Sequence, residues 1–242
     1  MAVKAADFII EYPYKKDENI LFHRWRDGEA RFEGTLSDYA FFIQSLLDLY
    51  ETSLDYKYLK TAINLCKKMV ELFYDDVNGG FYDVSGNDKS ILVRTKEDYD
   101  SAEPTGNSVA IMNLHRLSQL LDDNGLYNKA EHSLKQFTGR MSSQPFAMPQ
   151  MLCALDYYLN KPKQIIIAGD RLDSNTVEML REVNKRFIPN KILIYTNPAK
   201  RNNLIPYLDK ITKPSDKTLA YVCENYTCKL PTDSVDELVK LL

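Results

Sequence analysis

Two segments of this chain repeat the same helical-hairpin pattern about 70 residues apart. Each segment has two stripes of apolar residues at spacings of three and four, and a short polar turn separates the stripes. Ala40 and Leu47 of the first segment correspond to Ala110 and Leu117 of the second. Because two amphipathic helices joined by a short turn pack as an antiparallel pair, the repeat predicts a domain built from helical hairpins.

The same spacing locates the individual helices of this domain. Ser37 or Asp38 can cap the helix that begins near residue 36, and Pro104 suits an early position of the helix that contains Ala110. We expect five or six helices, or about three hairpins, within residues 1–160: 2–12, 36–50, 59–73, 110–121, 127–137 and 145–159.

The linkers that precede the hairpins are long and patterned. Residues 21–32 surround Asp27-Gly28, and this arrangement favours a β-hairpin with a glycine-containing turn. The second linker, 75–102, carries Gly79-Gly80 ahead of an aromatic pair. A linker of this length inside a compact domain is usually functional. Both linkers come directly before the first helix of a hairpin, so we expect them to open on the same end of the helical array.

The pattern changes after residue 160. The run Ile165–Ile167 is continuously apolar, as in a strand buried on both faces, and a helix over 174–187 separates it from a second strand at 192–195. These elements predict a parallel βαβ unit with a right-handed crossover. The remaining elements expected here are a third strand, 220–222, and a closing helix, 235–242, capped by Asp233.

The fold class that follows is mainly α. We expect a helical-hairpin domain over residues 1–160, followed by a small α/β module over 163–242.

Composition and charge narrow the class of protein further. Apolar residues make up 44% and charged residues 27% of the chain, which is typical of a globular protein. The formal net charge is -3 and basic residues are not clustered, so nucleic acid is not an expected partner. No apolar stretch approaches the ~18 residues that cross a bilayer, and the first residues lack the pattern of a signal peptide. We therefore expect a cytoplasmic protein with no membrane partner.

Several residues that often mark chemistry have a structural interpretation here. Gly169 is a single glycine after a strand, whereas dinucleotide sites need several. Cys223 and Cys228 are spaced like half a metal site or a redox pair; both alternatives stay open, but packing is the favoured interpretation. Segment 75–80 lacks the alternation and the closing glutamate of an EF-hand. We expect neither a metal nor a cofactor.

Carboxylates gather near the predicted helix starts, close in sequence to arginines and to the only tryptophan. On one end of a hairpin array, paired carboxylates can protonate a sugar and aromatic rings can hold it. The alternatives are structural: Asp38 and Glu103 can complement helix N-termini, and Trp25 can pack under the β-hairpin. The expected catalytic residues are Asp38, Asp100, Glu103 and His23. The expected substrate-binding residues are Arg24, Trp25, Arg31, Tyr39, Arg94 and Asn107.

Five segments carry a family resemblance: Gly34–Phe41 (GTLSDYAF), Leu46–Glu51 (LLDLYE), Gly79–Tyr82 (GGFY), Pro104–Ser108 (PTGNS) and Tyr221–Pro231 (YVCENYTCKLP). They resemble the C-terminal region of the thioredoxin-domain family that includes the spermatogenesis-associated proteins of animals and the bacterial YyaL proteins. The resemblance implies a thioredoxin-like domain followed by a six-hairpin (α/α) toroid, similar to N-acylglucosamine 2-epimerases and related six-hairpin glycosidases. For this sequence we expect about three of the six hairpins, a partial (α/α) hairpin toroid over residues 1–160, without the thioredoxin-like domain. The resemblance therefore does not extend a redox function to these residues.

Two functions from different classes follow from these observations. The first is binding or modification of a carbohydrate or another small molecule at the rim of the helical array. The alternative is a non-catalytic protein-interaction module of a thioredoxin-domain family protein. A partial toroid leaves two open edges, near residues 2–12 and 145–159, so we also expect a homodimer through these edges or an exposed apolar flank. The alternative is that the C-terminal module folds back and covers one edge.

Overall fold

The computed structural model describes residues 1–242 apart from 88–90, 161, 200–202, 213–215 and 225–226. The chain forms two compact units. The first, called here the helical unit, contains Met1–Ser118 and Asp123–Asp156. The second, called here the α/β unit, contains Gln119–Asp122 and Tyr157–Leu242.

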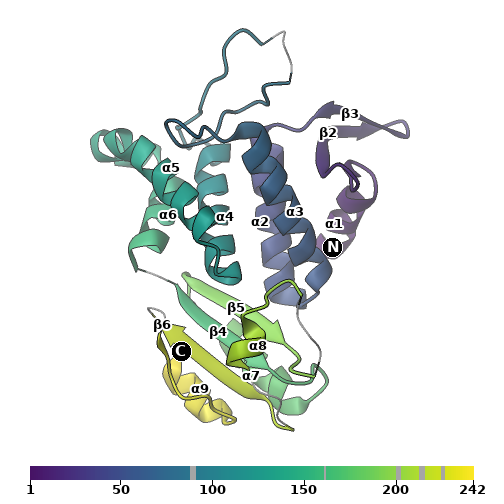
Figure 1. Ribbon diagram of the computed structural model, residues 1–242, viewed down its shortest axis with the longest axis vertical. Helices are drawn as coiled ribbons and strands as arrows, with labels where there is room; N and C mark the ends of the chain where they lie inside the picture. Colours follow the sequence, from purple (N-terminus) through teal and green to yellow (C-terminus); the bar gives the residue numbers. More distant parts are fainter. Residues whose placement is uncertain (88–90, 161, 200–202, 213–215, 225–226) are drawn as a thin grey trace. The chain divides into compact units, whose positions relative to one another are not determined.

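Helices dominate the helical unit (Figure 1). Each stretch with helical spacing forms a helix, with ends that differ by a few residues from the expected ones. The helices are α1 (Ala2–Glu11), α2 (Leu36–Ser53), α3 (Tyr56–Phe73), α4 (Gly106–Leu121), α5 (Asn124–Ser143), the 3-10 helix η1 (Pro145–Ala147) and α6 (Pro149–Asn160). The last residues of α4 and α6 belong to the α/β unit. A mainly helical fold with an α/β part is therefore confirmed.

The α2–α3 hairpin illustrates how the sequence pairs its helices. Leu54 ends α2 in the left-handed conformation, with a φ of 58°. The Asp55 carboxylate then caps α3 by accepting the Lys57 N–H at 2.9 Å. The apolar stripes of the two helices pack together and form the centre of the core. The largest fully buried side chains of this hairpin include Tyr39, Tyr50, Tyr58, Met69 and Phe73.

Helix α4 contacts α2 of the first hairpin and α5, its own partner in the second hairpin. The Asn113 side-chain amide donates to the Ala40 carbonyl of α2 at 2.7 Å. The His115 ring contacts the Tyr127 ring of α5 at a centroid distance of 6.1 Å. The Asp123 carboxylate caps α5 by accepting two backbone N–H groups. The second hairpin thus lies against the first, as the repeat predicts.

The first linker forms an antiparallel sheet of order β1-β2-β3, which confirms the expected β-hairpin. Asp27 and Gly28 form its turn with φ values of 53° and 80°, as a two-residue type I′ turn requires. The short strand β1 was not expected. The three strands are β1 (Tyr14–Lys15), β2 (Ile20–Arg26) and β3 (Glu29–Glu33).

The α/β unit contains a mixed sheet of order β5-β4-β6-β7. Strands β4 and β5 are parallel and are connected through α7, which confirms the βαβ unit. Strand β6 runs antiparallel to β4, and β7 is its antiparallel neighbour. The elements are β4 (Lys163–Ala168), α7 (Ser174–Asn184), β5 (Lys191–Thr196), α8 (Leu208–Ile211), β6 (Leu219–Glu224), β7 (Thr227–Cys228) and α9 (Val235–Leu241).

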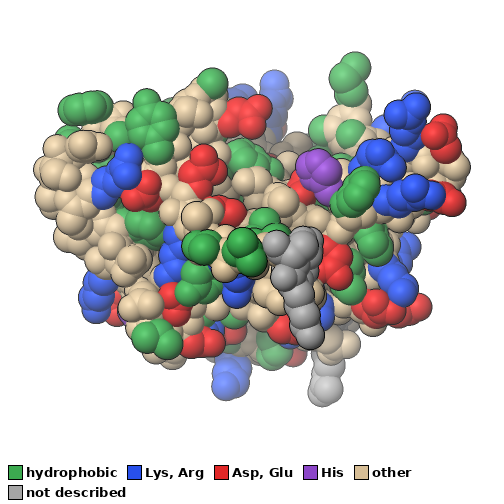
Figure 2. Space-filling model, turned by 90° about the horizontal axis from the view of Figure 1, so that it is seen from above, with side chains coloured by type: hydrophobic (Ala, Val, Ile, Leu, Met, Phe, Trp, Pro, Cys, Tyr) green, Lys and Arg blue, Asp and Glu red, His purple; other side chains and the backbone are tan. Residues whose placement is uncertain are grey.

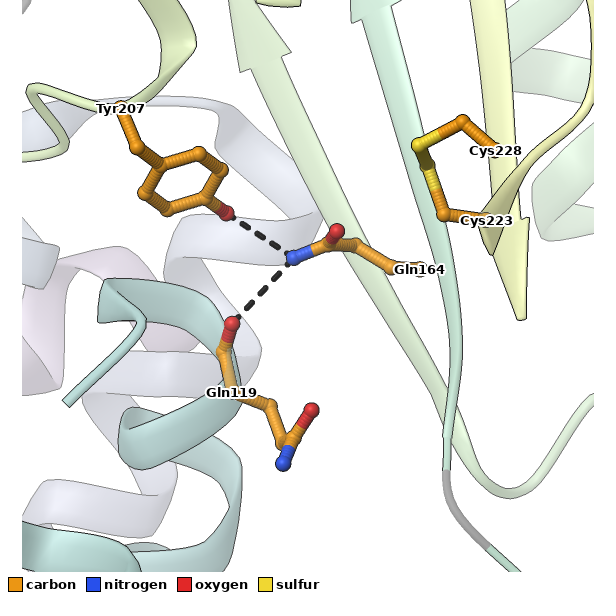
Figure 3. The surroundings of a disulfide bond; sticks show 5 residues. All are labelled: Gln119, Gln164, Tyr207, Cys223 and Cys228. Carbon is orange, nitrogen blue, oxygen red and sulfur yellow. Dashed lines mark hydrogen bonds between the residues drawn. A yellow bond between two sulfur atoms is a disulfide. The ribbon is translucent and has the colours of Figure 1, made fainter. Parts of the chain in front are cut away.

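The two faces of this sheet are covered differently. Ile165 and Ile167 of β4 contribute to a core that also takes Met179 from α7 and Leu238 from α9. On the other face, the Gln164 amide donates to the Gln119 carbonyl at 3.2 Å and to the Tyr207 hydroxyl at 2.9 Å (Figure 3). The last residues of α4 are thereby attached to the sheet of the α/β unit.

The caps of α2 and α9 and the end of α7 differ from the sequence-based expectation. The Asp38 carboxylate caps the start of α2 together with Thr35, which is the N-cap residue instead of Ser37 or Asp38. Helix α7 ends at Asn184, before Phe187. Helix α9 is capped by the Ser234 hydroxyl, which accepts the Glu237 N–H at 3.3 Å, while Asp233 pairs with a lysine instead.

The interpretation of Cys223 and Cys228 as packing residues was wrong. The two residues are directly opposed on β6 and β7 and form a disulfide, with a Cα–Cα distance of 3.9 Å. Packing alone explains Cys66, which is buried in α3.

Among the described residues, none of the helices is both long enough and apolar enough to span a bilayer.

Candidate functional site

A cavity of about 590 Å³ in the helical unit collects several of the expected site residues. It lies among α1, strand β2, the first turns of α2 and the end of the long linker. We call it the His23 pocket. Its lining residues are Ile9, His23, Thr35, Ser37, Asp38, Phe41, Phe42, Ser45, Glu97, Ser101, Glu103, Pro104 and Thr105.

The central polar contact of the pocket joins His23 to Asp38. His23 Nδ1 lies 2.9 Å from Asp38 Oδ2 and 3.1 Å from Oδ1. A carboxylate can only accept, so Nδ1 carries the hydrogen in this contact. In the neutral ring the lone pair then belongs to Nε2, which can accept a proton or a hydrogen bond. The His23 side chain is 59% exposed, so this nitrogen is accessible to a ligand.

Asp38 has a structural role in addition to its contact with His23. Its Oδ2 accepts the Thr35 N–H at 2.8 Å and the Thr35 hydroxyl at 3.0 Å, in the manner of a capping box. The carboxylate also lies in the first turn of α2, where the helix dipole stabilises negative charge. These contacts hold the Asp38 carboxylate in one orientation, and through it the imidazole of His23.

The linker before α4 supplies further polar groups to the pocket. Glu97, Ser101, Glu103 and Thr105 all line it. The Glu97 N–H donates to an Asp83 carboxylate oxygen at 3.0 Å, and the Glu97 carbonyl accepts from Asn107 at 3.1 Å. The linker backbone is therefore fixed where its side chains reach the pocket.

Aromatic rings lie in the pocket and next to it. Phe41 and Phe42 of α2 contribute to its lining. Phe8 of α1 contacts Tyr12, the residue that follows α1, at a centroid distance of 5.0 Å, and Tyr12 contacts Trp25 at 4.9 Å. Trp25 lies two residues after His23 on β2, so the two side chains share a face of the strand. We call Phe8, Tyr12 and Trp25 the aromatic row.

The structure brings His23, Asp38 and Glu103 together in one pocket. Asp100 is not part of the lining, because its carboxylate accepts backbone N–H groups: Thr105 at 2.8 Å, Gln150 at 2.9 Å and Met151 at 3.3 Å. It joins the linker to the start of α6 and is buried.

Asn107 and Arg94 also form contacts that hold the backbone. Asn107 is fully buried, where its side chain accepts the Phe81 N–H and donates to the Phe81 carbonyl, both at 2.8 Å. Arg94 donates to the Val84 and Leu72 carbonyls at 2.9 and 3.1 Å. Its guanidinium also lies over the Tyr82 ring. Neither residue lines the His23 pocket.

Tyr39 is a core residue. Its hydroxyl accepts the Leu21 N–H at 2.9 Å, and burial raises the pKa of this hydroxyl to about 12. The contact fixes β2 on α2, so Tyr39 positions the strand that carries His23.

Arg24 and Arg31 lie on the opposite face of the hairpin from His23 and Trp25. They are directly opposed in the β2–β3 register, and side chains alternate along a strand. Arg24 lies over the Phe32 ring, and Arg31 pairs with Glu29. On the face of the molecule drawn in Figure 2, basic and acidic side chains are interspersed, with hydrophobic side chains in several groups between them.

Sequence reasoning missed the contributions of Ile9, Phe41 and Glu97. Phe41 belongs to a segment quoted for the family resemblance, and Glu97 lies in the linker expected to be functional. Ile9 carries no local signal, because only the tertiary structure brings α1 to the pocket. Within the part of the chain that the structure describes, no cluster of three or more His, Cys, Asp or Glu side chains could hold a metal ion.

Comparisons with known proteins identify relatives but no reaction. No family model matches the sequence. The chain is 37% identical over 213 residues to spermatogenesis-associated protein 20 of Homo sapiens, and 36% identical to the Rattus norvegicus protein of that name. It is 29% identical over 214 residues to an uncharacterised protein of Caenorhabditis elegans.

These matches cover most of this chain but a small part of the relatives. The human match covers 86% of this chain and 27% of the human protein. The chain thus spans about a quarter of the length of the curated relatives it matches. Similarity to the spermatogenesis-associated proteins is confirmed, in the form expected of one region of a longer protein.

Proposed function

We propose that the helical unit binds a carbohydrate in the His23 pocket. The observation that carries the proposal is the combination of polar and aromatic groups in one cavity. A sugar presents hydroxyl groups that both donate and accept, and it presents flat C–H faces. Carboxylates and the His23 imidazole suit the hydroxyls, and Phe41 and Phe42 suit the apolar faces.

The size of the pocket and the aromatic rings next to it agree with a small-molecule ligand. Its volume of about 590 Å³ lies within the range of about 300–1,000 Å³ that small-molecule sites occupy. Phe8 and Trp25 of the aromatic row lie on α1 and β2, which also supply Ile9 and His23 to the pocket, and Tyr12 follows α1 directly. A ligand longer than one sugar can therefore extend from the pocket onto these rings.

The His23–Asp38 pair adds the capacity to move a proton. Asp38 holds Nδ1–H, so Nε2 is the atom that would take a proton from a sugar carbon or hydroxyl. Glu103 or Glu97 would be the candidate proton donors on the same ligand. This arrangement supports modification of a sugar, in addition to binding, as the finer form of the proposal.

We further infer that the hairpins form part of an (α/α) toroid of the thioredoxin-domain family. Two observations support this architecture. The α2–α3 and α4–α5 hairpins repeat one sequence pattern, and the relatives include the spermatogenesis-associated proteins on which the resemblance rests. In such a toroid the His23 pocket would open on the rim from which the linkers emerge.

Trp25 provides a direct test, since it is the only tryptophan in the chain. Titration of the protein with a panel of monosaccharides, amino sugars and oligosaccharides should give a saturable change in its fluorescence for at least one class. The Glu103→Gln variant should bind that class about tenfold more weakly, because a charge-assisted hydrogen bond is lost. The matched control is Glu71→Gln, an exposed carboxylate of α3 outside the pocket, which should bind as the wild type does.

A second arm of the experiment separates binding from chemistry. With the best ligand in D₂O, NMR would follow deuterium incorporation at carbon, and His23→Gln should abolish incorporation while binding remains. A fluorescence response that is absent across the whole panel, with the protein folded, would contradict the carbohydrate proposal.

That negative result would favour the alternative, a protein-interaction module. The observation behind this alternative is the exposed apolar surface of the long linker. Leu92 and Val93 are 95% and 76% exposed, and Tyr99 is also exposed. Apolar side chains that gather on one exposed segment can form a patch that contacts a partner.

A further inference from the structure

We propose that the Cys223–Cys228 disulfide is a thiol–disulfide exchange site for a small thiol of the glutathione type, with Cys228 as the exchanging cysteine and Cys223 as the resolving one. The site lies in the α/β unit and is independent of the carbohydrate proposal.

The position of the two cysteines in the sheet favours rapid re-formation of the disulfide after it opens. Cys223 of β6 is directly opposite Cys228 of β7, at a Cα–Cα distance of 3.9 Å. Cys223 is also opposite Gln164 of β4, whose amide binds Gln119 and Tyr207 (Figure 3). The strand that carries Cys223 is therefore held on its other side, and a released Cys223 thiolate stays beside Cys228.

The two cysteine residues differ in their access to solvent. Cys223 is 4% exposed, whereas Cys228 is exposed. Strand β7 is the outermost strand of the sheet, so a thiolate can approach Cys228 from its open side. Thiol–disulfide exchange requires direct attack of a thiolate on a sulfur, so we assign the attacked sulfur to Cys228, the exposed residue of the pair.

The reaction balances with two small thiols and no other reactant. The first thiolate attacks Cys228 Sγ, the Cys223–Cys228 bond breaks, and Cys223 leaves as a thiolate that takes a proton from water. A second thiolate then attacks the sulfur of the small thiol in the mixed disulfide and releases Cys228. The protein disulfide is reduced to two thiols, and the two small thiols are oxidised to their disulfide.

The surrounding structure keeps the hairpin in place when the bond opens. The Lys229 N–H donates to the Val222 carbonyl at 3.0 Å. Ala220 and Thr232 exchange two backbone hydrogen bonds at 2.8 and 3.0 Å. Leu238 of α9 is buried in the core of the unit. The chain after Cys228 therefore stays attached to β6 without the disulfide, as reversible exchange requires.

The other cysteines provide a contrast and define the background for the test. Burial raises the pKa of the Cys66 thiol to about 12, so it is unreactive at neutral pH. Cys153 of α6 is exposed and would react with the same probes. The variants below therefore carry Cys153→Ser.

Two single variants distinguish the roles of the cysteines. Cys223→Ser leaves Cys228 alone, and Cys228→Ser leaves Cys223 alone. With glutathione disulfide as the probe, mass spectrometry should show a mixed disulfide on Cys228 at least about tenfold faster than on Cys223, because the thiolate needs access. Equal rates for the two variants, or a faster reaction at Cys223, would overturn the assignment.

The protein with Cys223 and Cys228 intact provides the second measurement, which does not depend on how the variants fold. Incubation with reduced glutathione, followed by alkylation and mass spectrometry, should show both thiols, and addition of glutathione disulfide should restore the bond. Far-UV circular dichroism should be unchanged in both states. A disulfide that stays closed in excess reduced glutathione while the protein is folded, or that never forms under oxidising conditions, would refute the proposal.

Discussion

Gly79 and Gly80 form the turn that begins the long linker, and their φ values are 76° and 74°. The Gly79 N–H donates to the Asp75 carbonyl at 2.9 Å, and the Gly79 carbonyl accepts from Lys96 Nζ at 2.6 Å. Lys96 also pairs with the Asp75 carboxylate at 2.7 Å and holds its pKa well below the usual range. This turn places the linker against α5, where the Gly80 N–H donates to Ser133.

The substitution Gly79→Ala tests this turn at the level of one methyl group. A Cβ at Gly79 would lie 2.6 Å from the His132 carbonyl oxygen, in addition to the strain of a positive φ. We expect the free energy of unfolding to fall by about 3 kcal/mol, measured by urea denaturation.

The control for this prediction is Gly28→Ala in the β2–β3 turn. Gly28 has a similar φ of 80°, but a Cβ added at this residue would have nothing within 4 Å. In Gly28→Ala only the strain of a positive φ opposes folding, so the free energy of unfolding should fall by about 1 kcal/mol. Equal losses for the two variants would show that the Gly79 contact with α5 is not tight.

At the scale of elements, Asp100 joins the end of the linker to two helices. Its carboxylate accepts the N–H groups of Thr105, just before α4, and of Gln150 and Met151, in the first turn of α6. Its own N–H donates to the Ala147 carbonyl at 2.9 Å. A buried carboxylate with several backbone donors is a strong cross-link, because its charge is balanced by the hydrogen bonds and the helix dipole.

The Asp100→Asn substitution removes the charge and one acceptor position. We expect a loss of about 1–3 kcal/mol in the free energy of unfolding, measured by chemical denaturation. Asp98→Asn is the matched control two residues away. Asp98 pairs with Arg140 at 2.9 Å near the surface, so Asp98→Asn should lower the free energy of unfolding by less than about 1 kcal/mol. A larger effect at Asp98 than at Asp100 would contradict this account of the linker.

At the scale of the whole molecule, the exposed apolar residues of the two flanks bear on assembly. Val3 and Phe8 of α1 are exposed, as are Tyr12 directly after it and Phe146 in η1. These residues lie in the two segments that a partial ring of hairpins would leave open. Apolar side chains grouped on a surface favour association when a complementary surface is available.

We therefore predict that the chain self-associates, with a mass by light scattering that rises with concentration above 28.0 kDa. The double variant Val3→Glu and Phe146→Glu should shift the population towards the monomer, because a charge would be buried in the contact. Both side chains are exposed, so the variant should fold as the wild type does. A wild-type mass that stays at 28.0 kDa at high concentration would exclude this assembly.

The sequence by itself determined the type of nearly every element. A stripe with a period of 3.6 can bury one face only as a helix, which explains why α2, α3, α4 and α5 were predicted. Two further features were predicted from the local sequence: the buried strand at Ile165–Ile167 and the turn at Asp27-Gly28. A strand buried on both faces and a type I′ turn each have a local signature. Of the site residues predicted from the sequence, His23, Asp38 and Glu103 line the pocket.

Only the tertiary structure decided what the other polar residues do. Asn107 binds Phe81, which is 26 positions away, and Asp100 binds Gln150, which is 50 positions away, so no local pattern could show that these groups are used inside the protein. Ile9 lines the pocket because α1 packs beside it. Cys228 lies opposite Cys223 because of the register of β7 on β6. The physical reason is that a local period fixes which face of an element is apolar, whereas the partner of a polar side chain depends on which distant backbone is brought beside it.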